Sequence, residues 1–476
     1  MNSFSRMTVL SDEQVEKVRR ATEEIVETVG FCVQHEGILK AAKKAGARVD
    51  EGSGRVRIPK PLFRELLAQS PPRLTFRGIL GNRWEIGGQQ QWLLSIVTDP
   101  WVVDYGKQRP RRPSLEDLRR HTIITQKLES VAAVSRMDFP VTDVDDATSS
   151  LRALEVHLLN HVKHYLVLPA TLESFEQWMQ IGHILCGGAS LSELITVGIA
   201  VVSPLTLDGL NCELLVRAVE ERLSVVPTIC PIAGMTAPYS LASVLLQGNV
   251  EVLMVAALAQ MLRPGTPFIH AMGLSVADMR TGHDLYYTMD KVLWKIAGVQ
   301  LGLSYSMPTD AECGGSLTYR YDQQSGAEGM LFMLAASASG AHILAGIGSC
   351  HNANGMSAEM MIIQQGYLEA ARFLRRGMDT DDLRLGVESI KRVGPGGQFI
   401  TDDLTLALLR SGEFFWSDIF DFGGGHCDGK SMLERAHDRV EELVAGYESP
   451  LPGDVQEALR RHFHDLYASM GSKACA

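Results

Sequence analysis

The feature that most constrains this chain is a repeated alternation of short β-rich runs and longer helical runs between residues 92 and 375. Alternation of this kind, without hairpin signals, predicts a parallel sheet joined by right-handed helical crossovers. We expect strands at 92–97, 131–137, 164–169, 194–202, 225–230, 267–272, 302–306 and 342–347. We expect helices at 114–129, 148–161, 172–186, 208–223, 239–262, 284–299, 323–339 and 357–375.

Eight strand–helix units in about 285 residues match the size of a (β/α)8 TIM barrel, so the expected fold class is α/β. An open doubly wound sheet is the rival, and it is disfavoured because the first strand–helix turn lacks a glycine fingerprint. The chain starts with an amphipathic helix over 11–29 whose first turn carries a capping box. The expected parts are an N-terminal helical or cap region at 1–90, the barrel at 91–378 and a helical C-terminal region at 379–476.

Composition excludes several classes of partner. The 56 Asp and Glu residues outnumber 45 Lys and Arg, giving a net charge of −11, which argues against nucleic acid. The eight cysteines show no paired spacing of the kind that binds zinc. The N-terminus lacks the plan of a secretory signal, and the longest apolar runs fall short of the ~20 residues of a membrane span. We therefore expect a cytoplasmic homo-oligomer without a membrane segment.

Two motifs suggest chemistry that their context does not support. Gly424–Ser431 satisfies the P-loop pattern G-x-x-x-x-G-K-[ST], but the 45 residues after Ser431 show helical periodicity rather than a further strand. A flexible glycine-rich turn is favoured, and a nucleotide-binding protein stays a remote alternative. His157, His161 and His164 have helical spacing that suits a shared metal. A solvated or inter-helix face is favoured, and no metal site is predicted.

In a (β/α)8 barrel the active site lies at the C-terminal ends of the strands. The residues just past the predicted strands are rich in aromatic residues, methionine and glycine, and poor in charge. They include Trp101, Tyr105, Asp138, Phe139, Met272, Met307, Asp310, Glu312 and residues 347–352.

Several stretches, in order along nearly the whole chain, resemble the trimethylamine:corrinoid methyltransferase family. They are Val103–Gly106, Arg112–Leu118, Ser203–Asp208, Gly234–Pro238, Gln247–Glu251, Leu262–Pro267, Asp278–Gly282, Asp322–Gly326, Phe373–Gly377, Val393–Gly397 and Arg435–Ala436. The resemblance implies a (β/α)8 barrel with an N-terminal helical extension. It also implies transfer of a methyl group from an amine to cob(I)alamin, giving methylcobalamin, on a separate corrinoid protein.

The trimethylamine enzymes of this family carry pyrrolysine in the loop after the last strand. The corresponding position here is about Ile347, an ordinary residue, which implies the non-pyrrolysine branch that acts on quaternary amines such as glycine betaine. A quaternary ammonium is already an activated methyl donor, so cob(I)alamin can attack its methyl carbon directly. Such a site needs an aromatic cage for the cation and exclusion of water rather than an acid, base or metal.

The resemblance and the strand ends together nominate the site residues. The catalytic candidates are His351, Ile347 and Glu312. The candidates for substrate binding are the cage aromatics Trp101, Tyr105, Phe139 and Tyr319, the carboxylate donors Arg320 and Asn352, and Met307. Gly234, Thr236, Gly346 and Gly348 are the candidates for contact with the corrinoid.

Two departures from the family pattern bear on the substrate. Ser316–Tyr319 is apolar and aromatic where many members read Thr-Asp-Ser-Lys, and Gln398 stands where histidine usually follows Val-Gly-Pro-Gly-Gly. The alternatives that stay open are a tertiary amine or sulfonium donor on the same scaffold, and a barrel that binds a methylated amine without turnover.

Overall fold

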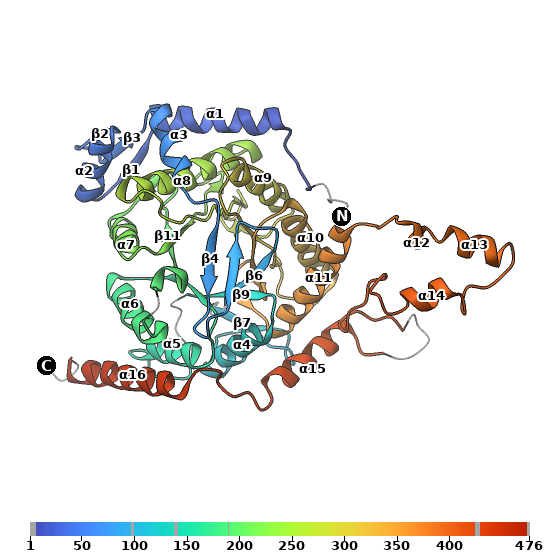
Figure 1. Ribbon diagram of the computed structural model, residues 1–476. Coiled ribbons are helices and arrows are strands. Elements are labelled where there is room, and N and C mark those ends of the chain that lie inside the picture. The colour runs from blue at the N-terminus through green and yellow to red at the C-terminus, as the bar shows by residue number, and fades with distance from the viewer. Residues whose placement is uncertain (1–5, 97–99, 138–140, 189, 424–428, 474–476) are drawn as a thin grey trace.

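The centre of the protein is a curled parallel sheet of seven strands. The computed structural model describes residues 6–96, 100–137, 141–188, 190–423 and 429–473 (Figure 1). The sheet has the order β13-β11-β10-β9-β6-β18-β17, and every neighbouring pair is parallel. Its strands are β6 (Trp92–Ile96), β9 (Val131–Met137), β10 (His164–Leu168), β11 (Ile195–Ala200), β13 (Ser224–Thr228), β17 (Asp310–Glu312) and β18 (Ile343–Ile347).

The two edge strands of this sheet, β13 and β17, are joined through the segment 267–270. Phe268 forms an isolated parallel bridge with Val225, and His270 forms another with Thr309. The amide of Asp310 donates to the carbonyl of His270 over 3.0 Å. The strand expected at 267–272 is therefore present as single bridges rather than as a continuous ladder.

One predicted strand is wrong. Residues 302–306 lie at the end of helix α9 (Asp290–Ser304), and the strand of this unit is β17, which begins at Asp310. The apolar run at 302–306 was mistaken for a strand because it continues the buried face of the helix. Trp294, Ala297 and Leu301, spaced three and four residues apart, all belong to one core cluster.

The other predicted helices of the repeat are confirmed, and they surround the sheet (Figure 1). They are α4 (Leu115–Lys127), α5 (Ser149–Leu159), α6 (Leu172–Cys186), α7 (Gly209–Glu220), α8 (Leu241–Leu262), α10 (Gln323–Ser339) and α11 (Ala358–Arg376), with a 3-10 turn η1 at Leu191–Glu193. By length and composition α8 is apolar enough to span a membrane, but 72% of its most apolar stretch is buried inside the protein. It is a core helix because the N-terminal helices pack against its outer side.

The N-terminal region contains those helices and two β-hairpins, β2–β3 and β4–β5. The capping box that starts its first helix is present, since Ser11 accepts from the Gln14 amide and Gln14 accepts from the Ser11 amide. The elements are α1 (Asp12–Thr28), β1 (Phe31–Val33), α2 (Glu36–Ala45), β2 (Arg48–Asp50), β3 (Arg55–Arg57), α3 (Lys60–Ala68), β4 (Leu74–Arg77) and β5 (Arg83–Ile86). Strand β1 also pairs with β12 (Thr206–Leu207), which ties this region to the loop after β11.

The β4–β5 hairpin closes one end of the curled sheet. Phe76, Trp84 and Ile86 form a cluster with side chains from the beginnings of the strands, among them Ala132 and Ile343. The ring of Phe76 stacks on His164, with centroids 3.8 Å apart. The N-terminal end of the sheet is thus filled, and a cavity can open only at the C-terminal end.

The three histidines are packed in this interior. Helix α5 ends at Leu159, so His161 and His164 do not continue its face, and all three histidines are fully buried. Burial lowers the pKa of His164 to about 3. The solvated reading is wrong, and these side chains are packing residues between a helix and the sheet.

Small sheets and helices complete the structure beyond the C-terminal ends of the strands. The short strands are β7 (Trp101–Val103), β8 (Pro110–Arg111), β14 (Ile232–Ala233), β15 (Ser275–Ala277), β16 (Asp284–Leu285), β19 (Ser349–Cys350) and β20 (Gly355–Met356). The C-terminal helices are α12 (Asp382–Leu385), α13 (Val387–Val393), α14 (Asp403–Leu408), α15 (Met432–Val444) and α16 (Gly453–Lys473). Figure 1 shows α12–α14 projecting from the body, whereas α15 and α16 pack against it.

Candidate active site

A cavity of about 290 Å³ lies at the C-terminal end of the curled sheet. Its deep part is apolar, with Leu94, Leu166 and Val226 pointing inward from three strands. Its outer part comes from the loops after the strands: Ile229, Met272, Gly273, Tyr286, Tyr287, Ser349 and Ala353. This is the place where parallel α/β sheets hold their substrates.

A cluster of buried charges lies beside the cavity, and of its members Tyr286 and Glu312 belong to the cavity lining. Lys291 and Lys295 are four residues apart on α9, so the helix places both ammonium groups on one face, opposite Glu312 of β17. Lys291 Nζ lies 3.2 Å from Glu312 Oε2, and Lys295 forms a closer ion pair with the same oxygen. The hydroxyl of Tyr286 donates to the other carboxylate oxygen. We call Tyr286, Lys291, Lys295 and Glu312 the buried charge cluster.

Burial dominates the electrostatics of this cluster. Both lysine side chains are almost completely buried, and loss of solvation holds their pKa values well below the ordinary value of 10.5. Burial also raises the pKa of Tyr286, and it raises the pKa of the cavity-lining Asp310 to about 7. Such concentrated pKa perturbation in a cavity is characteristic of functional sites.

Several carboxylates share the charge compensation in this cluster. Both lysines contact the Glu312 carboxylate, Asp284 acts electrostatically on Lys291 and Asp310 acts on Lys295, although Asp310 is only partly ionised near neutral pH. Within the described part of the chain, neither lysine Nζ nor Glu312 Oε2 has a partner in hydrogen-bond geometry. A buried charge without hydrogen bonds is costly, so the arrangement favours a ligand that brings an acceptor.

The two tyrosines of the cavity are held in place by glycines and by Asn352. A side chain at Gly273 would meet the Tyr286 hydroxyl, and one at Gly315 would meet the Tyr287 ring. Asn352 Oδ1 accepts from the Tyr286 amide over 2.7 Å, and its Nδ2 donates to the carbonyl of Asp284. Asn352 therefore positions the loop that carries both tyrosines.

Lys291 Nζ lies 2.8 Å from the centroid of the Tyr286 ring and 5.4 Å from that of Tyr287. The Tyr286 face is thus covered by the buried Lys291 ammonium. The Tyr287 ring lines the cavity and is the candidate contact for a positively charged ligand group, because an aromatic face attracts a cation most strongly where water is excluded.

Of the residues nominated from the sequence, Glu312 and Gly346 line the cavity. Gly346 adopts a left-handed φ of 84° beside Ile347, whose side chain is fully buried in the cluster behind the sheet, with Met356 and Met361. The amide of Gly348 donates to Gln364 over 2.7 Å. The backbone at the end of β18 therefore faces the cavity, whereas the Ile347 side chain packs away from it.

Three other nominated residues come together above the strands. Trp101 and Tyr319 both pack edge-on against His351, with ring centroids 6.4 Å and 5.5 Å away. The Arg112 guanidinium lies over the Trp101 ring at 4.1 Å. Partial burial lowers the pKa of His351. This rim trio is not among the residues that line the cavity, but its own loop continues to Ala353, which does.

The remaining nominated residues are scattered. Tyr105 stacks on His437 of α15 in a separate polar pocket of about 350 Å³. Arg320 forms an exposed ion pair with Asp322, and Met307 is buried in the core. Gly234 and Thr236 form the turn after β14, where the Thr236 hydroxyl accepts from the Ile232 amide. Phe139 and Asp138 lie outside the described residues.

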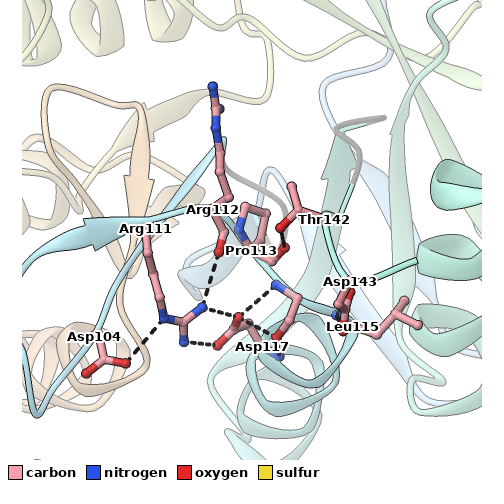
Figure 2. Close-up of polar contacts among 9 residues, drawn as sticks. Asp104, Arg111, Arg112, Pro113, Leu115, Asp117, Thr142 and Asp143 are labelled. Atoms are coloured by element: carbon pink, nitrogen blue, oxygen red, sulfur yellow. Dashed lines mark hydrogen bonds and ion pairs between the residues drawn. The ribbon is translucent and has the colours of Figure 1, made fainter. Parts of the chain in front are cut away.

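The polar pocket around Tyr105 is organised by one arginine. Figure 2 shows the Arg111 guanidinium between Asp104 and Asp117, and both bonds to Asp117 measure 2.6 Å. Burial alone would raise the pKa of Asp117, but hydrogen bonds from Arg111 and Ser114 outweigh it and lower the pKa to about 2. The cluster pins the β7–β8 hairpin, which carries Trp101 and Tyr105, to the start of α4.

The false P-loop is also resolved in part. Lys430 pairs with Asp438, and Ser431 caps α15 by accepting from the Glu434 amide. Residues 424–428 lie outside the described residues. The two residues that a P-loop would turn toward a phosphate and magnesium are instead engaged with α15.

Sequence reasoning missed Tyr286, Tyr287, Lys291 and Lys295. With the strand misplaced at 302–306, residues 284–299 were expected to be wholly helical, and the loop at 286–289 was not predicted. The usable signal was a pair of lysines, four residues apart, in an otherwise apolar helix. Buried lysines are rare unless they are paired or functional.

A family profile described as "Trimethylamine methyltransferase (MTTB)" matches residues 1–471. The chain belongs to this family. It is therefore a methyltransferase, and the resemblance seen in the sequence motifs is confirmed.

Relatives match along almost their full length. A glycine betaine methyltransferase of Desulfitobacterium hafniense (strain Y51) is 26% identical over 453 residues, which cover 94% of both chains. The trimethylamine methyltransferase MttB of D. hafniense (strain DSM 10664 / DCB-2) is 23% identical over 462 residues, covering 94% of this chain and 92% of the relative. The monomethylamine methyltransferase structure of Methanosarcina barkeri is 10% identical and covers 94% of this chain and 91% of that one. Its TM-score of 0.48 is too low to support any conclusion.

The motifs that carry the family resemblance hold loops together. Glu251 of α8 accepts from the Ser203 hydroxyl over 2.8 Å and from the Leu205 amide over 3.1 Å. Gln247 donates both to Glu251 and to the carbonyl of Thr236. These MTTB-family motifs thus fasten two rim loops to one helix rather than lining the cavity.

Proposed function

We propose that this MTTB-family protein transfers a methyl group from a quaternary amine that carries a carboxylate, such as glycine betaine, to cob(I)alamin on a separate corrinoid protein. The single observation that carries the proposal is the cavity, which combines tyrosine rings in its lining with a buried charge cluster whose lysines have no partner in hydrogen-bond geometry among the described residues. The family match and the 26% identical glycine betaine methyltransferase support the reaction class.

The fold that accompanies this proposal is a (β/α)8 barrel. The bridges of segment 267–270 to both β13 and β17 support it, because they place an eighth parallel segment between the two edge strands. The hairpin β4–β5 then closes one end of the barrel. The methyl donor and the methyl acceptor must enter from the other end.

In this mechanism the corrinoid supplies the electron pair that attacks the methyl carbon, and the protein binds and orients the donor. The Tyr287 ring attracts the ammonium group, while Lys291 and Lys295 donate to the carboxylate. The apolar floor of Leu94, Leu166 and Val226 excludes water. A quaternary ammonium leaves as a neutral tertiary amine, so no proton has to move.

The rim residues keep proposed roles. Trp101, Tyr319 and His351 stand above the strand ends, where they would contact the incoming acceptor. Gly346 and Gly348, with Gly234 and Thr236, leave backbone that a flat corrinoid can approach closely. A cytoplasmic location is part of this proposal, since the acceptor protein must be within reach.

The test is a spectroscopic assay of the purified protein with cob(I)alamin and a panel of donors. We expect methylcobalamin to form with betaines, slowly or not at all with choline, which lacks the carboxylate, and not with trimethylamine. Lys291→Met should raise KM for the betaine more than tenfold and leave KM for choline, where measurable, within twofold. Failure of every quaternary amine to give methylcobalamin would contradict the proposal.

A second candidate, methyl transfer from a tertiary amine, is favoured by Asp310. An acid in the cavity whose pKa is raised to about 7 can protonate the amine that leaves. The two candidates differ in pH dependence: transfer from a quaternary donor should be nearly independent of pH through 7. Transfer from a tertiary donor should fall as pH rises past 7, and Asp310→Asn, which removes the acid that protonates the leaving amine, should lower this rate at every pH and leave no such fall.

A further inference from the structure

The segment from α12 to Trp416, residues 382–416, is the part of the chain that the proposed reaction leaves unexplained. We call it the arm. Figure 1 shows α12, α13 and α14 projecting sideways from the body, away from the helices around the sheet. The three helices are only four, seven and six residues long. Helices this short are not stable in water without partners.

The arm has a defined internal shape. The carboxylate of Asp402 is almost completely buried and accepts from Ser389 and from Arg392, which joins α13 to the start of α14. At the base, Arg376 donates to the carbonyls of Gly412 and Glu413 over 2.6 Å each. These bonds hold the arm as a loop of fixed form rather than as a free linker.

The arm nevertheless exposes its apolar side chains. α12 and α14 have no buried residue, and α13 has only Ser389. Phe414 is 85% exposed and Ile400 76%. The exposed large apolar side chains of the arm are Leu383, Leu385, Val387, Ile390, Phe399, Ile400, Leu406, Leu409, Phe414 and Trp416. They fill a segment that is less than a tenth of the chain.

The exposed apolar area is large enough for a stable interface. Ten such side chains present on the order of 1,000 Å², whereas a standard interface buries about 800 Å² on each partner. So much exposed apolar surface on one short segment marks an interaction site. A groove of about 600 Å³, lined by Leu383, Val387, Leu404 and Ala407, adds a concave contact surface.

The arm starts at the end of the sheet opposite to the cavity. Arg372 donates to the carbonyl of Gln91 over 2.9 Å, and Arg375 bonds the Gln91 side chain. Gln91 directly precedes β6, so the end of α11, from which the arm leaves, lies at the N-terminal ends of the strands. The corrinoid protein has to approach the C-terminal ends and has to leave after each transfer. A permanently exposed apolar arm needs a permanent partner at another place.

We propose that the arm is the oligomerisation element of this protein and packs against a second copy of the same chain. A second copy is always present at the same concentration, and reciprocal exchange of two arms covers both apolar surfaces in one symmetric contact. This inference does not depend on the identity of the methyl donor.

The experiment is sedimentation velocity of the full-length protein between 0.1 and about 50 µM, a range that brackets the affinities of ordinary stable dimers. We expect the unmodified chain to be a dimer or a higher oligomer. The double variant Ile400→Glu/Leu409→Glu should shift to monomer, with a dissociation constant raised at least a hundredfold. The control Val29→Glu/Leu172→Glu places the same charges on exposed apolar positions of the body and should leave the assembly unchanged.

A second measurement addresses folding of the variant. Hydrogen exchange of the unmodified protein should show arm amides that become more protected as protein concentration rises, while amides of α6 do not change. A monomeric unmodified chain, or an arm variant that keeps its assembly, would overturn the inference. Loss of corrinoid-protein binding by the arm variant, with its oligomeric state unchanged, would overturn it in favour of the acceptor as the partner.

Discussion

The cavity and the arm depart from ordinary protein packing in opposite directions. The cavity buries two lysines and a glutamate in a largely apolar interior, and the arm leaves ten large apolar side chains in water. Each arrangement costs free energy in the isolated chain, because charge is favoured outside and apolar surface inside. In our proposals each cost is offset by a partner: the carboxylate of the donor at the cavity, and a second chain at the arm.

The cavity and the arm also differ in how firmly the surrounding protein holds them. The cavity is rigid: its tyrosines are fixed by glycines and Asn352, so the ligand enters a prepared site. The arm is held in form by polar bonds at Asp402 and Arg376, but its short helices bury almost nothing, so its apolar side chains depend on a partner for burial. Changes in the cavity should therefore alter stability and activity together, whereas changes in the arm should alter assembly.

The largest effect is expected for Glu312→Gln. Removing the carboxylate that both lysines contact leaves two buried ammonium groups without their nearest counterion, which costs about 3 kcal/mol of unfolding free energy. Urea unfolding at pH 7 measures the change. The control is Glu457→Gln, an exposed partner of Arg461 whose loss should cost less than about 0.5 kcal/mol. Equal effects of the two variants on the unfolding free energy would show that the Glu312 carboxylate does not stabilise the buried lysines.

Asp310→Asn should change the pH dependence of stability. The folded-state pKa of about 7 lies above the ordinary 3.8, so the unfolded chain releases this proton first and stability falls as pH rises from about 4 to 7. The variant should be more stable than the unmodified protein at pH 8, by up to about 4 kcal/mol. This advantage should shrink by half or more at pH 5. Thermal unfolding at both pH values measures it, and a constant difference would contradict the assignment.

Lys291→Met should stabilise the chain while impairing the proposed substrate binding. The substitution leaves one lysine for one carboxylate and replaces a buried ammonium by an apolar side chain of similar length, which is expected to gain about 1 kcal/mol. Loss of stability together with unchanged KM for betaines would show that Lys291 is a structural residue instead. Urea unfolding and donor titration on the same preparation distinguish the two.

The smallest effect on the single chain is expected in the arm. Ile400→Ser removes an exposed apolar side chain and should change the unfolding free energy of the dilute monomer by less than about 0.5 kcal/mol. It should still weaken self-association measurably in sedimentation equilibrium. A large loss of monomer stability would show that the arm packs on its own body.

The sequence was a good guide to the repeat and a poor guide to the cavity wall. Six of the eight expected strands and all the expected helices of the repeat are present as elements, because local hydrophobic periodicity specifies them, and the strand expected at 267–272 is present as isolated bridges. The strand at 302–306 failed because a helix with a broad apolar face imitates a buried strand over five residues. With the strand and helix of this unit misplaced, Tyr286, Tyr287 and the two lysines were not predicted as site residues.

The candidate residues at the rim were only partly placed by the sequence, again because side-chain contacts depend on distant parts of the chain. Trp101, Tyr319 and His351 come together although they are far apart in the chain, as expected for loops at one end of a sheet. Tyr105 belongs to the same rim but turns to stack on His437, a residue contributed by α15. No local pattern indicates which way a loop side chain points, because the neighbour that attracts it comes from another part of the chain.

The sequence by itself determined the order of strands and helices, the capping of the first helix and the family to which the chain belongs. These follow from local periodicity and from motifs that fasten loops to one helix, such as Gln247 and Glu251. Only the tertiary structure decided which charges share the cavity and which apolar residues stay exposed. Burial is a property of the whole packed molecule: the same lysine is an ordinary surface residue until β17 and α9 enclose it.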